Sequence, residues 1–409
     1  MRQQESHVRA VRLRRHGLIG ACSVAATMAA TLIATPSTAA PTQNTANYAT
    51  SSQASPASQQ ALSLMRKAAS SRATIGDLAN GRTRMSATSV TPNATVTLPA
   101  EGSFVSYQNK AYRIVGGATL YVSSWTPFGG KQKVTAITTA QWNALRVMPK
   151  DGTFVRAMPG GSIYRVVAGA PIYVSTWAAF GGPQARLDID AADVTHAGQD
   201  APWDGLSSQT LDFDGVLDGN PTGPSVFVKG GQTGQIYKMV GGSPVYVQSW
   251  AAYGGAHAYT VVDQNAIDNA GQAGNYRFVL KHPMNDWPIR DGQGKFYVIA
   301  GGAPIYLPTA SLMDGITPSL VASNDLGQMT SAAPYDNLLF RPLSPTYLRG
   351  VQSGSVYQVL DGVPHYLASW SYVGGTQTRV DVDQLAIDNA GTGGAYNHLL
   401  PLGTPVPAP

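Results

Sequence analysis

The chain of 409 residues has little charge and almost no cysteine. Only 12% of its residues are charged, about half the usual share, which argues against a coiled coil and against a charged disordered tail. Its single cysteine is Cys22, which lies near the N-terminus. If that segment is removed, the mature protein has no thiol. Disulfides and thiolate metal sites are then excluded, and burial alone must stabilise the fold.

The positive charge is concentrated at the N-terminus. Five arginines and Glu5 give residues 1–39 a charge of +4, which leaves +1 of the formal +5 for the rest of the chain. A nearly neutral mature protein lacks the basic surface that binds nucleic acid, so we expect no nucleic-acid partner. No apolar run of about 18 residues follows residue 39, so we also expect no membrane span there.

Residues 1–39 have the order of a secretory signal peptide: an arginine-rich start, the apolar run Leu18–Ala34 and small residues up to Ala39. Cleavage after Ala39 is preferred, because a cut one residue later would place Pro41 directly after the bond. The pair Arg14-Arg15 leaves twin-arginine export open. Cys22 resembles the lipidated cysteine of a lipobox, but most of the apolar run follows it, which favours an ordinary signal. The protein is therefore expected to be secreted, extracellular or associated with the cell wall.

Residues 40–91 are rich in Ser, Ala, Thr and Gln and poor in aromatic residues. Such a segment buries too little apolar surface to offset the entropy of ordering it, which predicts a flexible tether. Residues 92–409 form the remaining domain.

That domain contains five copies of one unit. The core of the first copy runs from Tyr112 to Val122, with two tyrosines on either side of a small-residue turn. The other cores begin at Tyr164, Tyr237, Tyr297 and Tyr357, and the second tyrosine recurs in register as Tyr121, Tyr173, Tyr246, Tyr306 and Tyr366. The approximate units are residues 96–145, 146–200, 221–271, 275–330 and 335–402.

Each core predicts a β-hairpin, since Gly-Gly or Asp-Gly between two β-branched and aromatic runs supplies the positive φ of a tight turn. A run such as Phe154-Val155-Arg156 predicts a further strand upstream. Downstream lies a segment with Trp and Gly-Gly, then a fourth strand and a short helix. Asp263 and Asp383 precede these helices and suit helix caps better than catalytic acids.

The pattern predicts an all-β fold with minor short helices. Two architectures fit: a five-bladed β-propeller, slightly preferred because closure protects strand edges, and an open repeat array. Further strands at Val96–Pro99 and Leu399–Leu402 would close the ring in the first case and cap the ends in the second.

The paired tyrosines, the small-residue turn, the tryptophan and the Phe-Gly-Gly segment are best seen from Tyr164 to Gly182. This pattern resembles uncharacterised repeats in proteins secreted by high-GC Gram-positive bacteria, sometimes found with cell-wall hydrolases. The resemblance covers roughly residues 96–402 and implies an extracellular or wall-associated setting, with no catalytic residues to transfer.

Four tryptophans are the candidate ligand-binding residues. An exposed indole can stack on a sugar ring, so related platforms would give a multivalent carbohydrate surface. The alternative, which is favoured because large aromatics are mostly buried, is that each packs its own Gly-Gly segment onto the hairpin. These residues are Trp125, Trp177, Trp250 and Trp370.

A candidate calcium site lies in the insertion between copies two and three. Asp212, Asp214 and Asp218 lie there with interspersed glycines, as in flexible oxygen-rich loops that bind this cation. The segment lacks EF-hand spacing, so a plain surface loop is favoured, and no other cofactor is expected.

No motif for nucleophilic, metalloprotease or phosphate chemistry occurs, which favours a protein without catalytic activity. The leading interpretation is a secreted repeat protein that binds cell-wall or environmental glycan. Two alternatives stay open: an extracellular polysaccharide hydrolase on a five-bladed propeller, with a carboxylate pair at one channel mouth, and a protein-interaction scaffold.

Copy four departs from the pattern, because Ala310 stands where the other copies have Trp. Pro308 predicts a hairpin that ends early. Trp287, interpreted as the counterpart of Phe154 and Phe227, is predicted to be buried in compensation.

Overall fold

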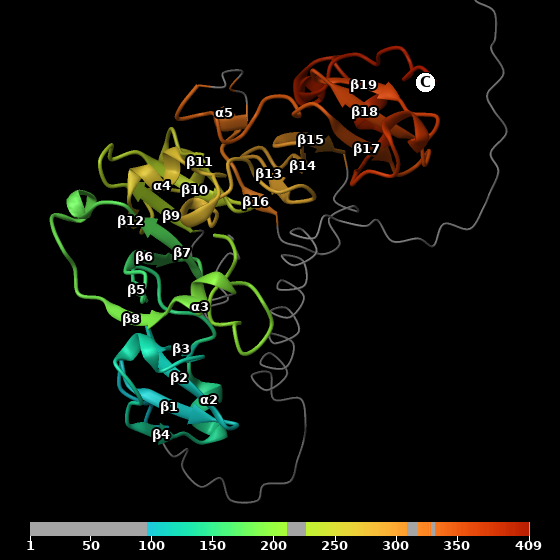
Figure 1. Cartoon of the computed structure of the whole chain (residues 1–409). Helices are drawn as coiled ribbons and strands as arrows, with labels where there is room; N and C mark the ends of the chain where they lie inside the picture. Colours follow the sequence, from blue (N-terminus) through green and yellow to red (C-terminus); the bar gives the residue numbers. More distant parts are fainter. Residues whose placement is uncertain (1–95, 211–225, 309–317, 327, 329–331, 409) are drawn as a thin grey trace, which may run out of the picture. The chain divides into compact units, whose positions relative to one another are not determined.

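The computed structural model describes residues 96–210, 226–308, 318–326, 328 and 332–408. The expected signal peptide and tether lie outside the described residues. The described residues form five four-stranded sheets in tandem, coloured from cyan to red in Figure 1, which confirms the all-β repeat class. Closure into a ring stays a prediction. None of the helices in these ranges has the length and apolar character needed to cross a membrane.

Each sheet is built from one copy of the repeat. The first contains β1 (Phe104–Tyr107), β2 (Lys110–Val115), β3 (Ala118–Tyr121) and β4 (Val134–Ala136). The second contains β5 (Phe154–Met158), β6 (Ser162–Val167), β7 (Ala170–Val174) and β8 (Leu187–Asp190). The third contains β9 (Phe227–Gly230), β10 (Ile236–Val240), β11 (Ser243–Tyr246) and β12 (Thr260–Val262). The fourth contains β13 (Pro288–Arg290), β14 (Phe296–Ala300), β15 (Ala303–Leu307) and β16 (Ser319–Leu320). The fifth contains β17 (Thr346–Gly350), β18 (Val356–Leu360), β19 (Val363–Tyr366) and β20 (Val380–Val382).

All five sheets have the same topology. The first three strands form an antiparallel meander, and the fourth strand returns to pair in parallel with the first, as in the order β3-β2-β1-β4. The register places the two repeated tyrosines opposite each other in every hairpin, for example Tyr112 opposite Tyr121 and Tyr357 opposite Tyr366. The repeated tyrosine spacing therefore sets the hairpin register.

The hairpin turns have the predicted conformation. Gly116 and Gly117 have φ values of 56° and 77°, and the Ala168-Gly169 and Asp361-Gly362 turns also have positive φ at both positions. Two consecutive residues with positive φ match the twist of the flanking strands.

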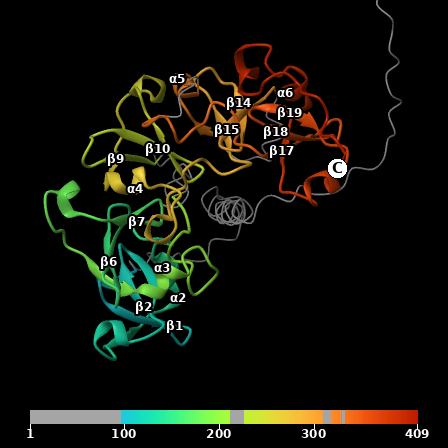
Figure 2. The ribbon, with the colours of Figure 1, turned by 45° about the horizontal axis from the view of Figure 1, so that its top comes forward.

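Short helices follow the hairpins. The α-helices are α2 (Thr139–Ala144), α3 (Ala191–Thr195), α4 (Gln264–Asp268), α5 (Ser323–Leu326) and α6 (Gln384–Asp388). The 3₁₀ helices are η1 (Thr126–Phe128), η2 (Trp177–Phe180), η3 (Trp250–Tyr253), η4 (Gly274–Tyr276), η6 (Trp370–Val373) and η7 (Gly394–His398). The carboxylates of Asp263 and Asp383 accept hydrogen bonds from the Asn265 and Leu385 amides, so both predicted caps are confirmed. Figure 2 shows α6 beside the fifth sheet, where it contacts β17.

The hydrophobic cores lie between consecutive sheets. Four of the five buried clusters combine side chains of neighbouring units, and the remaining one belongs to the first unit. Representative members from the two units are Leu120 and Val166, Ile172 and Met239, Val245 and Ile299, and Ile305 and Val359. Each sheet therefore depends on its neighbour in the chain for part of its burial.

The segment after each helix returns to the hairpin turn of its own unit. In the first unit the amides of Arg146 and Lys150 donate to the carbonyls of Gly117 and Gly116, at 3.0 and 2.9 Å. The same contact recurs in the later units, and in the fifth it is made by the Leu400 amide to the Gly362 carbonyl. These bonds hold the start of the next unit against the preceding hairpin.

The expected strands at the two ends of the repeat domain are wrong. Val96–Pro99 is irregular, and the Thr97 carbonyl accepts a hydrogen bond from the side chain of Gln141 in its own unit. Leu399–Leu402 is also irregular, and the chain continues past it along β19, where the Val406 amide donates to Tyr366. The backbone of each segment forms hydrogen bonds within its own unit, at the Thr97 carbonyl and at the Leu400 amide, and does not extend a sheet.

Copy four confirms one expectation and corrects two. Trp287 is buried, at 4% exposed, and its Nε1 donates to Ser319 Oγ at 3.1 Å. The register places Pro288, not Trp287, at the position of Phe154. The hairpin does not end early, because Pro308 follows the last residue of β15 and removes no hydrogen bond from the ladder. Ala310 lies outside the described residues.

Replacing Trp287 by Ala should lower the free energy of unfolding by about 3–5 kcal/mol, since it removes a large buried side chain from a core shared by the third and fourth units. Urea denaturation followed by circular dichroism measures this change. Trp125→Ala, at a half-buried position, is the control and should cost less. A loss well under about 1 kcal/mol for Trp287→Ala would contradict the assignment to the core.

A second pair of variants tests the hairpin turn. A Cβ at Gly116 would lie 2.6 Å from Thr153 Oγ1 and 2.8 Å from the Lys150 amide, whereas a Cβ at Gly129 would have no atom within 4 Å. Both glycines have positive φ, so Ala strains the backbone at either position. Gly116→Ala should therefore destabilise by roughly 2–4 kcal/mol and Gly129→Ala by about 1 kcal/mol. Equal melting temperatures for the two variants would refute the close packing of the turn.

Candidate functional site

The four candidate tryptophans are half-buried. This result lies between the exposed binding platform and the buried packing residue that the sequence left as alternatives. Each indole packs against an aromatic ring on the first strand of its own sheet. The ring centroids are 5.3 Å apart for Trp125 and Phe104, 5.4 Å for Trp177 and Phe154, 4.9 Å for Trp250 and Phe227, and 5.4 Å for Trp370 and Tyr347. Part of each side chain thus supports the loop onto its sheet, and part faces solvent.

A short 3₁₀ helix holds each tryptophan. Three of these helices begin after a Ser or Thr whose hydroxyl accepts the amide two residues later, as Thr176 accepts the Ala178 amide at 3.2 Å. Each ends at a glycine in the left-handed region, followed by a second glycine with φ between 111° and 119°. At both glycine positions a Cβ would meet no neighbour, so backbone conformation and not space requires glycine.

Sequence analysis missed the residue that closes this loop. Seven positions after Trp177, the side-chain amide of Gln184 donates to the carbonyls of Phe180 and Gly182, at 2.8 and 3.0 Å. Gln132 and Gln377 make the same pair of bonds, and in the third unit the ring of His257 contacts the Tyr253 carbonyl. The signal was available as a constant spacing from Trp to Gln in three copies.

A basic side chain on the second strand reinforces the same loop in the first three units. It lies over an aromatic ring, with Arg113 5.0 Å from the centroid of Phe104 and Arg165 4.8 Å from that of Phe154. It also donates to a main-chain carbonyl in the fourth strand of the next sheet. These bonds join Arg113 to Asp188, Arg165 to Val261 and Lys238 to Leu320. The tryptophan loop is therefore tied to the neighbouring unit.

The helix-capping aspartates also connect units. Asp263 Oδ1 accepts hydrogen bonds from Asn265 and Gln232 of its own unit. Its Oδ2 accepts the Ser175 amide and hydroxyl, both at 2.7 Å, and the Thr176 amide at 3.1 Å. Burial would raise the pKa of Asp263, but these hydrogen bonds outweigh it and hold the pKa below its ordinary value.

Asp190 repeats this contact between the first two units, with Ser123 and Ser124 as its partners. The loop that carries Trp125 or Trp177 is thus anchored by a carboxylate of the following unit. Asp190 and Asp263 therefore accept hydrogen bonds on both oxygens, one set within the unit and one from the preceding unit.

The junction between the third and fourth units is built differently. Ala322 occupies the position of the capping aspartate, and Asp325 lies buried in the first turn of α5, at 4% exposed. Burial raises the pKa of Asp325 to about 7, although a main-chain hydrogen bond from Gln248 acts in the opposite direction. This carboxyl group is partly protonated at neutral pH.

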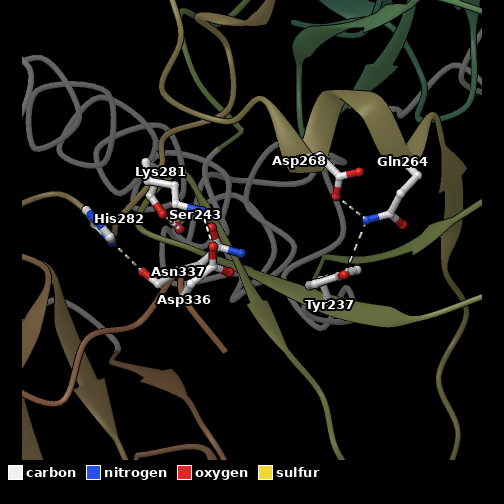
Figure 3. Close-up of polar contacts among 8 residues, drawn as sticks. All are labelled: Tyr237, Ser243, Gln264, Asp268, Lys281, His282, Asp336 and Asn337. Carbon is white, nitrogen blue, oxygen red and sulfur yellow. Dashed lines mark hydrogen bonds and ion pairs between the residues drawn. The ribbon is translucent and has the colours of Figure 1, made fainter. Parts of the chain in front are cut away.

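Figure 3 shows a polar cluster at the same junction. Lys281 Nζ forms an ion pair with Asp336 at 2.5 Å, and His282 Nδ1 donates to the Asn337 carbonyl at 3.1 Å. The Lys281 carbonyl accepts from Ser243 Oγ. Burial lowers the pKa of His282, so its ring is neutral near pH 7. These contacts fix two linkers to each other.

The candidate calcium ligands Asp212, Asp214 and Asp218 lie outside the described residues. Among the residues that the structure describes, no group of three or more His, Cys, Asp or Glu side chains could hold a metal ion.

Comparisons with known proteins add no relative on which to base a function. No family model matches the sequence, and no curated protein matches it. Among solved structures, the chain is matched to one from the periplasmic assembly of the ESX-5 inner membrane complex, at 12% identity and a TM-score of 0.14. That match covers 77% of this chain and 94% of the other, and a score this low supports no argument about fold or function.

Replacing Asp263 by Asn should lower the free energy of unfolding by about 2–3 kcal/mol, because both carboxylate oxygens accept hydrogen bonds and an amide nitrogen would face donors. The lowered pKa of Asp263 adds stability above pH ~4, which is lost as pH falls through the folded-state pKa. The difference between wild type and variant should therefore be largest above pH ~4 and shrink below it.

Chemical denaturation at several pH values measures this difference. Asp268→Asn, at an exposed position of the same helix, is the matched control and should have little effect. A constant difference across the acid range would show that the charge of Asp263 is not what stabilises the junction.

Proposed function

We propose that this protein is a secreted, non-catalytic repeat protein whose tryptophan loops bind glycan of the cell wall or the environment. The observation that carries the proposal is that four indoles are held in one recurring aromatic environment and stay partly exposed. A buried tryptophan could not contact a ligand, and a fully exposed one would lack a fixed orientation.

The chemistry of the loop suits a sugar polymer. An indole presents an apolar face to the apolar face of a sugar ring, and its N–H can meet a hydroxyl. A polymer repeats its own unit, so several weak contacts to related loops add through effective concentration. The low charge of the chain agrees with a neutral ligand at these loops.

The test is retention on insoluble peptidoglycan, chitin and cellulose. Wild type should be retained by at least one polymer, and changing Trp125, Trp177, Trp250 and Trp370 together to Ala should weaken retention by about 100-fold or more. Each single variant should weaken it only several-fold. Trp142→Ala is the matched control, because Trp142 stacks on Tyr107 at 4.4 Å and belongs to no tryptophan loop. Circular dichroism spectra verify that every variant is folded.

Two outcomes contradict the proposal. Wild type that binds none of the polymers removes the glycan ligand, and cross-linking to a secreted protein would then support the scaffold alternative. A quadruple variant that binds as well as wild type would show that the tryptophan loops serve only to support the sheets.

A further inference from the structure

A cavity of about 620 Å³ lies between the fourth sheet and the segment that follows α6, a size typical of ligand sites. One wall comes from the loop between β13 and β14, from β14 and from α5, and the other comes from residues 391–401 of the fifth unit. Phe340 and Arg341 complete the lining. The polar and aromatic side chains that matter below are Asp291, Lys295, Tyr297, Ser323, Arg341 and His398.

Two positions that line the cavity differ between the fourth unit and the third and fifth units. In the third unit, a Cβ at Gly230 would lie 1.8 Å from Gln264 Oε1, so the Gln264 side chain occupies the space above that glycine. Gln264 also donates to Asp268 at 2.8 Å and to the Tyr237 hydroxyl at 3.4 Å (Figure 3). Gly350 and Gln384 repeat this arrangement in the fifth unit, where a Cβ at Gly350 would lie 1.7 Å from Gln384 Oε1.

The fourth unit has Asp291 and Ser323 at the two equivalent positions. The Asp291 carboxylate accepts the amides of Gln293 and Lys295, at 2.8 and 2.9 Å, and faces the Tyr297 hydroxyl at 3.5 Å. Ser323 is much shorter than the glutamine it replaces, and it lines the cavity together with Tyr297. The space that a glutamine occupies in the third and fifth units is therefore lined by Asp291 and Ser323 in the fourth.

The lining combines positively charged side chains with groups that accept hydrogen bonds. Lys295 and Arg341 provide two positive charges against the single carboxylate of Asp291. The Nε of Arg341 is buried and has no hydrogen-bond partner in the described part of the chain. A buried guanidinium N–H without an acceptor is costly, so an anionic ligand group would remove an existing penalty.

His398 adds an acceptor. Its Nδ1 lies 2.8 Å from the Phe340 carbonyl, which can only accept, so Nδ1 carries the proton. Burial lowers the pKa of His398, which keeps the ring neutral and leaves Nε2 as an acceptor for a hydroxyl. The Asp291 carboxylate is a second acceptor in the lining.

We propose that this cavity binds a hydroxylated carboxylic acid of sugar size, such as a uronic acid, with its carboxylate at Arg341 and Lys295 and its hydroxyls toward Asp291 and His398. A singly charged carboxylate matches the excess of one positive charge. The site is separate from the tryptophan loops, and the proposal does not rest on their function.

The experiment is isothermal titration calorimetry of the full chain with D-glucuronate and with D-glucose at low ionic strength. Glucuronate should bind roughly tenfold or more tightly than glucose, since only glucuronate offers an anion to Arg341. The double variant Asp291→Gly with Ser323→Gln restores the pattern of the third and fifth units and should abolish binding by filling the cavity. Arg341→Gln should weaken binding by about tenfold or more. Arg290→Gln, at the exposed neighbour of Asp291, is the control and should leave affinity unchanged.

Three results would overturn the proposal: no binding of glucuronate, equal binding of glucose, or binding that survives both the filled cavity and Arg341→Gln. Tighter binding of glucose 6-phosphate than of glucuronate would reassign the site to phosphate esters and also refute it. The quadruple tryptophan variant should bind glucuronate as wild type does. The polymer-binding proposal and the proposal for the cavity can therefore fail independently of each other.

Discussion

Burial of one sheet against the next is the interaction on which this structure depends. A four-stranded sheet of about 20 residues has too little apolar surface for a core of its own. Four of the five buried clusters accordingly combine side chains of neighbouring units. The first unit has an additional cluster that includes Tyr112 and is covered by Trp142, and the fifth sheet is bordered by the C-terminal segment along β19. Stability therefore arises from nearest-neighbour interfaces, as in other repeat proteins.

Polar contacts at the same junctions determine how neighbouring units meet. Asp190 and Asp263 each cap a helix in one unit and anchor the tryptophan loop of the preceding unit. Arg113, Arg165 and Lys238 cross in the other direction, to the fourth strand of the next sheet. The loops that carry Trp125 and Trp177 are thus joined to the following unit by two separate sets of contacts, which limits the movement of the half-exposed indoles.

Departures from the repeat locate the features that differ in chemistry. The third and fifth units fill the space beside the hairpin with a glutamine above a glycine. The fourth unit has Ser323 and Asp291 at these two positions, and both residues line the cavity. Its junction with the third unit also lacks the capping aspartate and contains Asp325, whose pKa burial raises to about 7. The fourth unit thus differs from the others both at its junction with the third unit and in the residues that line the cavity.

The sequence by itself determined the elements that local rules control: the five hairpins and their register, the positive-φ turns and the helix caps at Asp263 and Asp383. These follow from side-chain alternation, glycine conformation and capping, which involve residues close in the chain. The exposure of the tryptophans, the parallel fourth strand, the irregular ends and the position of Trp287 were decided only by tertiary structure. The reason is sequence distance: Ser175 and Asp263 meet across 88 residues, and Lys238 reaches Leu320 across 82, so no local pattern specifies either contact.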